Sequence, residues 1–228
     1  MRITVLGIVA TALVAAFAGT ANAQQPVSPA VAPGVAGPAE SGAPALRQIP
    51  IADLAGLFKI DPKTSRPAQS YLRLVGAFEV AETRDAHLVD AWSPGYLPVT
   101  LKFSDGRCFS LTADYYSSAV KSGTLSNARL VPISCDHPTP HARPAAQPSD
   151  PALRYIGSAW GYGAWADDRT GTTIVSVPFT ETFEPLFTTR MSVSTILALN
   201  GVDTPSGDVT LVGRIDGRLT IVTLEVGY

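Results

Sequence analysis

The stretch of residues 99–135 constrains the fold of this chain more than any other part of it. Apolar residues alternate with others on both sides of Asp105-Gly106, and alternate residues of a strand point to one face. Asp-Gly between two such runs is a strong signal for a β-hairpin, because a tight type I′ turn requires positive φ at both central residues. The stretch also holds both cysteines, Cys108 and Cys135. It therefore predicts antiparallel strands that a disulfide could connect.

The N-terminus has the pattern of a secretory signal peptide. Arg2 precedes an apolar run over residues 3–18, and small residues in an A-x-A arrangement follow at 21–23. The apolar run is short for a membrane span of about 20 residues, and polar, proline-rich sequence comes next. We predict cleavage after Ala23 and a soluble, periplasmic or secreted chain with no transmembrane segment after cleavage.

Export decides how the two cysteines are interpreted. Free thiols, a redox pair and metal ligands are the alternatives to a disulfide. Disulfides persist in oxidising compartments, so an even pair in an exported chain predicts a structural bond between Cys108 and Cys135. Such a bond closes a loop of about 28 residues, for which the chain-entropy model gives roughly 3–4 kcal/mol.

Charge excludes one class of partner. The chain has 17 basic and 19 acidic residues, and loss of Arg2 with the signal peptide leaves 16 against 19, a net charge of −3. A general nucleic-acid binder needs a basic footprint, so we expect no nucleic acid as partner.

Two proline-rich segments divide the chain. Residues 24–45 contain Pro, Ala, Gly and Ser without aromatics, which predicts a disordered spacer. Residues 136–151 contain five prolines and no large apolar residue, which predicts a linker or a long surface loop. The rest reads as two β-rich domains, 46–135 and 152–228, or as one domain with a long loop between.

The fold class follows from local patterns and is mainly β with a minor helical part. We expect hairpin-rich small domains, a few short helices and one intrachain disulfide. Alternating runs predict strands at 70–80, 87–92, 129–134 and 172–177, two strands on either side of the turn within 99–111, and a last hairpin about Asp216-Gly217. Helical spacing predicts short helices at 51–60, 113–121 and 192–200, the last capped by Ser192 and ended by Gly201.

Candidate catalytic residues are few. Ser118 and Lys121 match the S-x-x-K pattern, in which a lysine one helical turn away assists the serine. The S-x-N and K-T-G elements that accompany that pattern are not in place, so chance is the better explanation. The acidic pairs Asp167-Asp168 and 181/184 lie in predicted loops, where a solvated surface is the default expectation.

A metal site is not predicted. Cys135, His137 and His141 have the residue types of zinc ligands, but a tetrahedral site needs three or four of them. The disulfide occupies the cysteine, and prolines prevent a helix that would align the histidines. We expect no metal and no cofactor, and we expect His87 to be an ordinary strand residue.

The aromatic stretch of residues 155–165 is the most suggestive candidate for ligand binding. Tyr155, Trp160, Tyr162 and Trp165 are interleaved with glycines. Such residues can form a platform that stacks on sugar rings, or they can be core residues of a β domain, which is the commoner case.

These observations favour an exported, soluble, non-enzymatic binding or structural protein of a bacterial-type cell envelope, with a glycan or an envelope protein as partner. Two alternatives stay open. One is a small envelope hydrolase that acts on glycan or peptide through carboxylates or through Ser118 with Lys121. The other is a subunit of a larger envelope assembly whose edge strands pair with partners.

Overall fold

The structure is a computed structural model that describes residues 42–65, 68–93, 99–118, 121–136, 145–159, 161–178, 180–198 and 206–227. At residues 115–118, 121–123, 198 and 206–208 the description covers the backbone alone. The described residues belong to one compact unit that begins at Ser41. The predicted signal peptide and nearly all of the predicted spacer lie outside the described residues. None of the described helices is long and apolar enough to cross a membrane.

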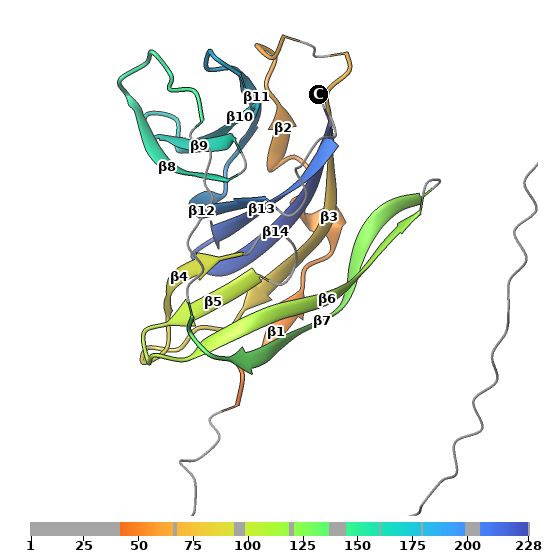
Figure 1. The fold of residues 1–228 in the computed structure, drawn as a ribbon, viewed down its shortest axis with the longest axis vertical. Helices are drawn as coiled ribbons and strands as arrows, with labels where there is room; N and C mark the ends of the chain where they lie inside the picture. The colour runs from red at the N-terminus through yellow and green to blue at the C-terminus, as the bar shows by residue number, and fades with distance from the viewer. Residues whose placement is uncertain are drawn as a thin grey trace, which may run out of the picture. The chain divides into compact units, whose positions relative to one another are not determined.

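Within the described residues the strands form three antiparallel sheets (Figure 1). Sheet A has the order β1 (Leu46–Gln48), β3 (Tyr71–Val80), β14 (Arg218–Gly227), β13 (Ser206–Ile215) and β12 (Ser192–Ala198). Sheet B has the order β2 (Phe58–Ile60), β11 (Pro185–Thr189), β10 (Thr172–Ser176), β9 (Tyr162–Asp167) and β8 (Leu153–Ala159). Sheet C has the order β4 (Leu88–Trp92), β5 (Val99–Phe103), β6 (Cys108–Ser118) and β7 (Lys121–Ile133).

Sheet A is buried on both faces. On β14, Val222 and Leu224 pack with sheet B, whereas Leu219 and Ile221 pack with sheet C. A strand covered on both sides reads as an almost continuous apolar run, which explains the sequence RLTIVTLEVG of residues 218–227. The central sheet therefore carries two hydrophobic cores, one on each face.

Strands from distant parts of the chain share these sheets. In sheet A, β3 pairs with β14, and in sheet B, β2 pairs with β11. Both sheets therefore combine strands that precede and strands that follow the proline-rich segment 136–151.

The two Asp-Gly hairpins form different turns. Asp216 and Gly217 have φ of 51° and 78°, as a two-residue type I′ turn requires. In the first hairpin only Gly106 of the pair has positive φ, at 85°. There Gly106 N–H donates to Phe103 O at 3.0 Å, and Phe103 N–H donates to Arg107 O at 2.9 Å. Both hairpins are confirmed, but the first one closes with a longer turn.

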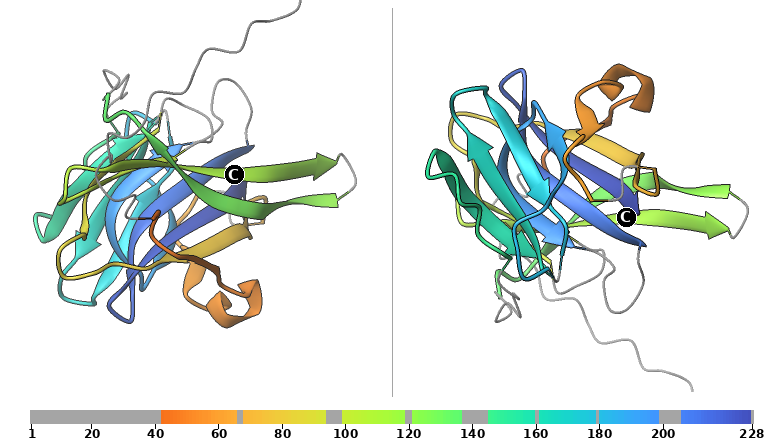
Figure 2. Two further views of the ribbon diagram at one scale, coloured as in Figure 1. Left: turned by 90° about the horizontal axis from the view of Figure 1, so that it is seen from below. Right: turned by 90° about the horizontal axis from the view of Figure 1, so that it is seen from above.

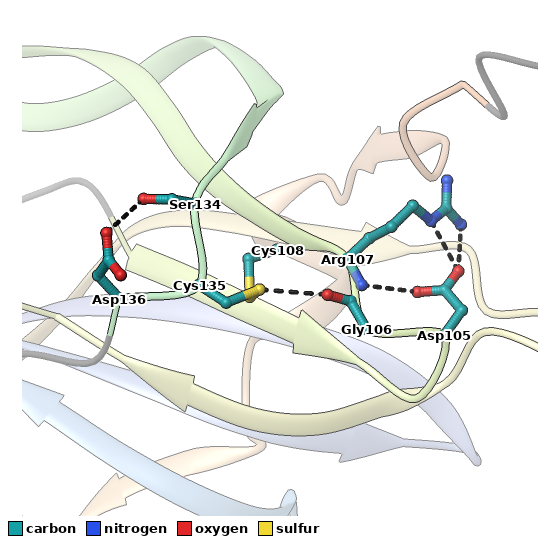
Figure 3. The surroundings of a disulfide bond; sticks show 7 residues. All are labelled: Asp105, Gly106, Arg107, Cys108, Ser134, Cys135 and Asp136. Carbon is teal, nitrogen blue, oxygen red and sulfur yellow. Dashed lines mark hydrogen bonds and ion pairs between the residues drawn. A yellow bond between two sulfur atoms is a disulfide. The ribbon is translucent and has the colours of Figure 1, made fainter. Parts of the chain in front are cut away.

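The predicted disulfide is confirmed. Cys108 and Cys135 are bonded, and their Cα atoms are 5.3 Å apart, within the usual range for a disulfide. Figure 3 shows the bond beside the turn in which Arg107 N–H donates to Asp105 Oδ1 at 3.0 Å. The bond links the first residue of β6 to the segment that follows β7, so it closes one end of sheet C.

The predicted helix at 192–200 is wrong, because residues 192–198 form strand β12. A register shift between Val193 and Thr195 lets Val193 and Ile196 face the same core, although three positions separate them. Leu197 packs against the other core. A bulge in a strand buried on both faces therefore reproduced the apolar spacing of a helix.

The other two predicted helices are also corrected. Residues 108–118 are strand β6, so the helix predicted at 113–121 is wrong. Of the helix predicted at 51–60, a single 3-10 turn remains, η1 (Ile51–Leu54), and β2 follows it. Gly56, with φ of 89°, reverses the chain between the two. The strands predicted at 70–80, 87–92 and 172–177 are confirmed within one residue. The two strands predicted on either side of the turn within 99–111 are β5 and β6, but β6 continues to Ser118, and the strand predicted at 129–134 is part of the longer β7.

Candidate functional site

The aromatic residues predicted as a platform lie on different faces of sheet B. Tyr162 is 2% exposed and packs in the core between sheets A and B. Trp165 is 0% exposed and points to the opposite, outer face, because its position on β9 is three residues from Tyr162. Tyr155 on β8 is 46% exposed. Trp160 lies outside the described residues.

Trp165 is covered on the outer face of sheet B by residues that are distant in sequence. The ring of Phe183 meets the indole edge to face at 5.1 Å, and the ring of Tyr155 lies 5.7 Å away. A Cβ on Gly163 would lie 1.9 Å from the indole and 2.6 Å from Ala145. Gly163 is therefore required as a glycine, because the indole occupies the space above it.

The indole Nε1–H of Trp165 is buried without an acceptor in the part of the chain that the structure describes. An unpaired buried polar group costs about 1–3 kcal/mol. Packing of the ring must offset that cost, as it does for a core aromatic residue. Of the described aromatic residues in this stretch, only Tyr155 presents a ring to solvent.

An ion-pair network lies at the end of the same sheet. Arg169 Nε donates to Asp167 Oδ1 at 2.9 Å, and its Nη2 donates to Asp150 Oδ2 at 2.7 Å. Hydrogen bonds from Arg169 lower the pKa of Asp167, and the two carboxylates raise the pKa of Arg169. A general acid requires a raised carboxyl pKa, so Asp167 lacks the electrostatics for that role.

The second acidic pair is engaged in holding a loop. Glu184 Oε1 accepts from the backbone N–H of Ser65 at 2.7 Å and from the hydroxyl of Thr64 at 3.3 Å. Glu181 is exposed. The carboxylate of Glu184 thus connects the segment after β2 to the segment before β11.

Ser118 and Lys121 lie at the outer end of the β6–β7 hairpin. They are paired across the two strands, so no helical turn separates them. The S-x-x-K mechanism relies on a helix to place the lysine beside the serine. The backbone at these positions does not supply that geometry.

His87 and Ser104 form a contact that the sequence did not predict. Ser104 Oγ lies 3.1 Å from His87 Nδ1 and 3.3 Å from the carbonyl oxygen of Asp85, and it accepts the His87 backbone N–H at 3.2 Å. No carboxylate among the described residues contacts the His87 ring. Without such a group to orient the imidazole, the pair lacks the third member of a nucleophilic triad.

The described residues contain no group of three or more His, Cys, Asp or Glu that could hold a metal ion. His137 and His141 lie outside them. The expectation that Cys135 serves in a disulfide is confirmed, which removes one candidate ligand.

Arg169 and Phe183 were not singled out from the sequence. A local signal exists for Arg169, because the same Asp-x-Arg spacing gives the same contacts at Asp105 and Arg107, where Arg107 Nε donates to Asp105 Oδ2 at 2.7 Å (Figure 3). No local signal marks Phe183, because it reaches Trp165 only through the pairing of strands.

Comparison with known proteins provides no assignment. No family model, no curated protein and no solved structure matches this chain.

Proposed function

We propose that this chain is an exported, non-enzymatic binding or structural protein of a bacterial-type cell envelope. The observation that carries the proposal is the bond between Cys108 and Cys135 in a chain whose N-terminus has a signal-peptide pattern, and the contacts of the charged side chains agree with it. Four carboxyl groups have a pKa that is shifted downward: Glu79, Asp105, Asp150 and Asp167. Hydrogen bonds from neighbouring arginines, or from a backbone N–H at Asp150, favour the ionised form in each case. The neighbours of these four groups do not raise the carboxyl pKa, as the surroundings of a general acid would.

Ion pairs also link neighbouring strands of sheet A. Arg47 on β1 and Arg218 on β14 both contact Glu79 on β3. Arg73 on β3 pairs with Glu225 on β14. Exposed ion pairs of this kind add little free energy each, about 0–1 kcal/mol, but they define strand neighbours. This use of charge supports a structural or binding role.

Export is supported by the signal-peptide pattern and by the bond between Cys108 and Cys135. Disulfides are maintained in the periplasm and outside the cell. The proposed partner is a glycan or an envelope protein. For a glycan, Tyr155 is the residue of the aromatic stretch that has an exposed ring able to stack on a sugar.

The test is co-sedimentation of the mature chain, residues 24–228, with purified peptidoglycan at low and at high salt. Tyr155→Ala removes the exposed ring, and Tyr71→Ala is the matched control, because Tyr71 is a 42% exposed tyrosine on sheet A. Salt-resistant pelleting that Tyr155→Ala lowers and Tyr71→Ala does not would support glycan binding at sheet B. Absence of pelleting at both salt concentrations would contradict a wall ligand and leave an envelope protein as partner.

The hydrolase alternative is tested in the same tubes. Release of soluble sugar or peptide from the peptidoglycan would contradict the non-enzymatic proposal. If release occurs and Lys121→Ala leaves it unchanged, the serine version of that alternative is also excluded.

A further inference from the structure

The outer half of the β6–β7 hairpin is a two-stranded ribbon, which we define as residues 112–118 and 121–129. Strand β5 pairs with β6 only from Cys108 to Leu111. The pairing of β6 with β7 continues from Thr112 to Ser118. Over that length neither strand has a third strand among the described residues, and Figure 2 shows the ribbon running past the other strands.

The inner half of the ribbon packs against β3 of sheet A. Leu125 is 2% exposed and lies on Gly76 of β3, where an added Cβ would be 2.8 Å from the Leu125 Cβ. Asn127 has φ of 50° at a register shift, and its side-chain N–H donates to Asp114 Oδ2 at 2.7 Å. Bulges of this kind redirect a strand. The ribbon therefore leaves sheet C in a defined direction.

An isolated two-stranded ribbon is marginally stable in water, and its open edges are templates for further pairing. Within the ribbon the edge formed by β7 carries two charged residues, Lys121 and the exposed Arg129, and charged residues on an edge strand oppose strand addition. The edge formed by residues 112–118 of β6 contains no proline and one charged residue, Asp114. The edge of β6 is thus the one left open to a partner strand.

The charge of the ribbon indicates what that partner is. Between residues 112 and 126, Asp114 and Lys121 are the charged residues, so the net charge is zero. A strongly charged partner would gain no electrostatic attraction from this ribbon, and a second copy of the chain would not be repelled by it. Identical strands that pair antiparallel about a twofold axis also make each contact twice.

We propose that β6 pairs antiparallel with β6 of a second copy over residues 114–118, which joins two ribbons into a four-stranded sheet. With Tyr116 on the twofold axis, Asp114 of one copy lies opposite Ser118 of the other. Ser118 is itself opposite Lys121 of its own copy. Asp114 of one copy and Lys121 of the other then lie in one row, two strand spacings or about 10 Å apart, so this register places opposite charges rather than like charges across the seam. This dimer goes beyond the proposed function and does not depend on the ligand.

The first test is the molar mass of the exported, disulfide-bonded mature chain in solution, measured by sedimentation velocity over a range of concentrations. The mass should rise toward that of a dimer. A matched variant replaces residues 116–124 by Asn-Gly, which keeps Leu125 on Gly76 and turns the chain between the paired positions 115 and 125. This variant should remain a monomer with an unchanged thermal midpoint. A wild-type chain that is monomeric at every concentration would overturn the proposal.

The second test traps the register. In the proposed sheet the two copies of residue 116 have Cα atoms about 5 Å apart, within the reach of a disulfide. The two copies of Thr124, which is paired with Tyr116 on β7, are three strand spacings or about 14 Å apart. Tyr116→Cys should give a covalent dimer on a non-reducing gel, and Thr124→Cys should not. Cross-linking through Thr124→Cys alone would show that the β7 edges meet instead, and a wild-type dimer with neither cross-link would overturn the register.

Discussion

Sheets B and C cover opposite faces of the same central sheet, but they are assembled in different ways. Sheet C consists of four strands in chain order, β4 to β7, and a disulfide closes it. Sheet B includes β2, which lies far upstream in the sequence. The aromatic cluster at Trp165 and the ion pairs of Arg169 stabilise this sheet. Sheet C therefore relies on a covalent bond between strands that are close in sequence, whereas sheet B relies on packing between strands that are distant in sequence. The following three experiments test that contrast.

The largest effect is expected on sheet B from Trp165→Ala. The indole is fully buried beneath Phe183 and over Gly163, so its removal should lower the free energy of unfolding by about 3–5 kcal/mol. Urea denaturation measures the loss. Val89→Ala, at an exposed position on sheet C, is the control and should change it by about 0.5 kcal/mol or less. A small loss for Trp165→Ala would show that the cluster does not hold sheet B.

The next effect is expected on sheet C when both cysteines are changed to serine. The chain-entropy model gives a loss of roughly 3–4 kcal/mol for this loop. Hydrogen exchange should quicken more in residues 99–133 than in residues 153–189, because the bond closes sheet C alone. Equal acceleration in both sheets would mean that sheets B and C unfold together. The disulfide would then stabilise both sheets and not sheet C in particular.

The smallest effect concerns the two Asp-x-Arg turns, one in each covering sheet. The folded-state pKa of Asp167 and of Asp105 lies below the ordinary value of 3.8, so the stabilisation is present above about pH 4 and is lost as the pH falls through the folded pKa. Arg169→Gln and Arg107→Gln should each make the acid-induced fall of the thermal midpoint shallower. Arg169→Gln should have the larger effect, because Arg169 also binds Asp150. An unchanged acid slope in both variants would contradict this assignment.

The local features of the fold were predictable. Asp-Gly between alternating runs identified both hairpins, because that signal lies within a few residues. The two cysteines, interpreted together with the signal-peptide pattern, identified the disulfide. The strand β12 was missed because a bulge gave Val193 and Ile196 helical spacing. The pairing of β3 with β14 has no local signal, since both strands simply read as apolar.

The candidate site was less predictable than the fold. The aromatic stretch was visible in the sequence, but the burial of Trp165 depends on Phe183 and Ala145, which sheet topology brings to it. The arginines that keep Asp167 and Glu79 ionised are of two kinds. Arg169 is two residues from Asp167 and was readable, whereas Arg47 reaches Glu79 only because β1 pairs with β3.

The position of β14 in the middle of sheet A sets the order in which this protein can mature. The ribosome makes β3 early and β14 late, and β3 has no neighbour on that side until residues 218–227 exist. Until then neither hydrophobic core is complete, and such long-range pairing is slow to form. We expect the nascent chain to stay unfolded throughout synthesis, which is the form in which a polypeptide can be threaded through a membrane channel before it folds and oxidises on the far side.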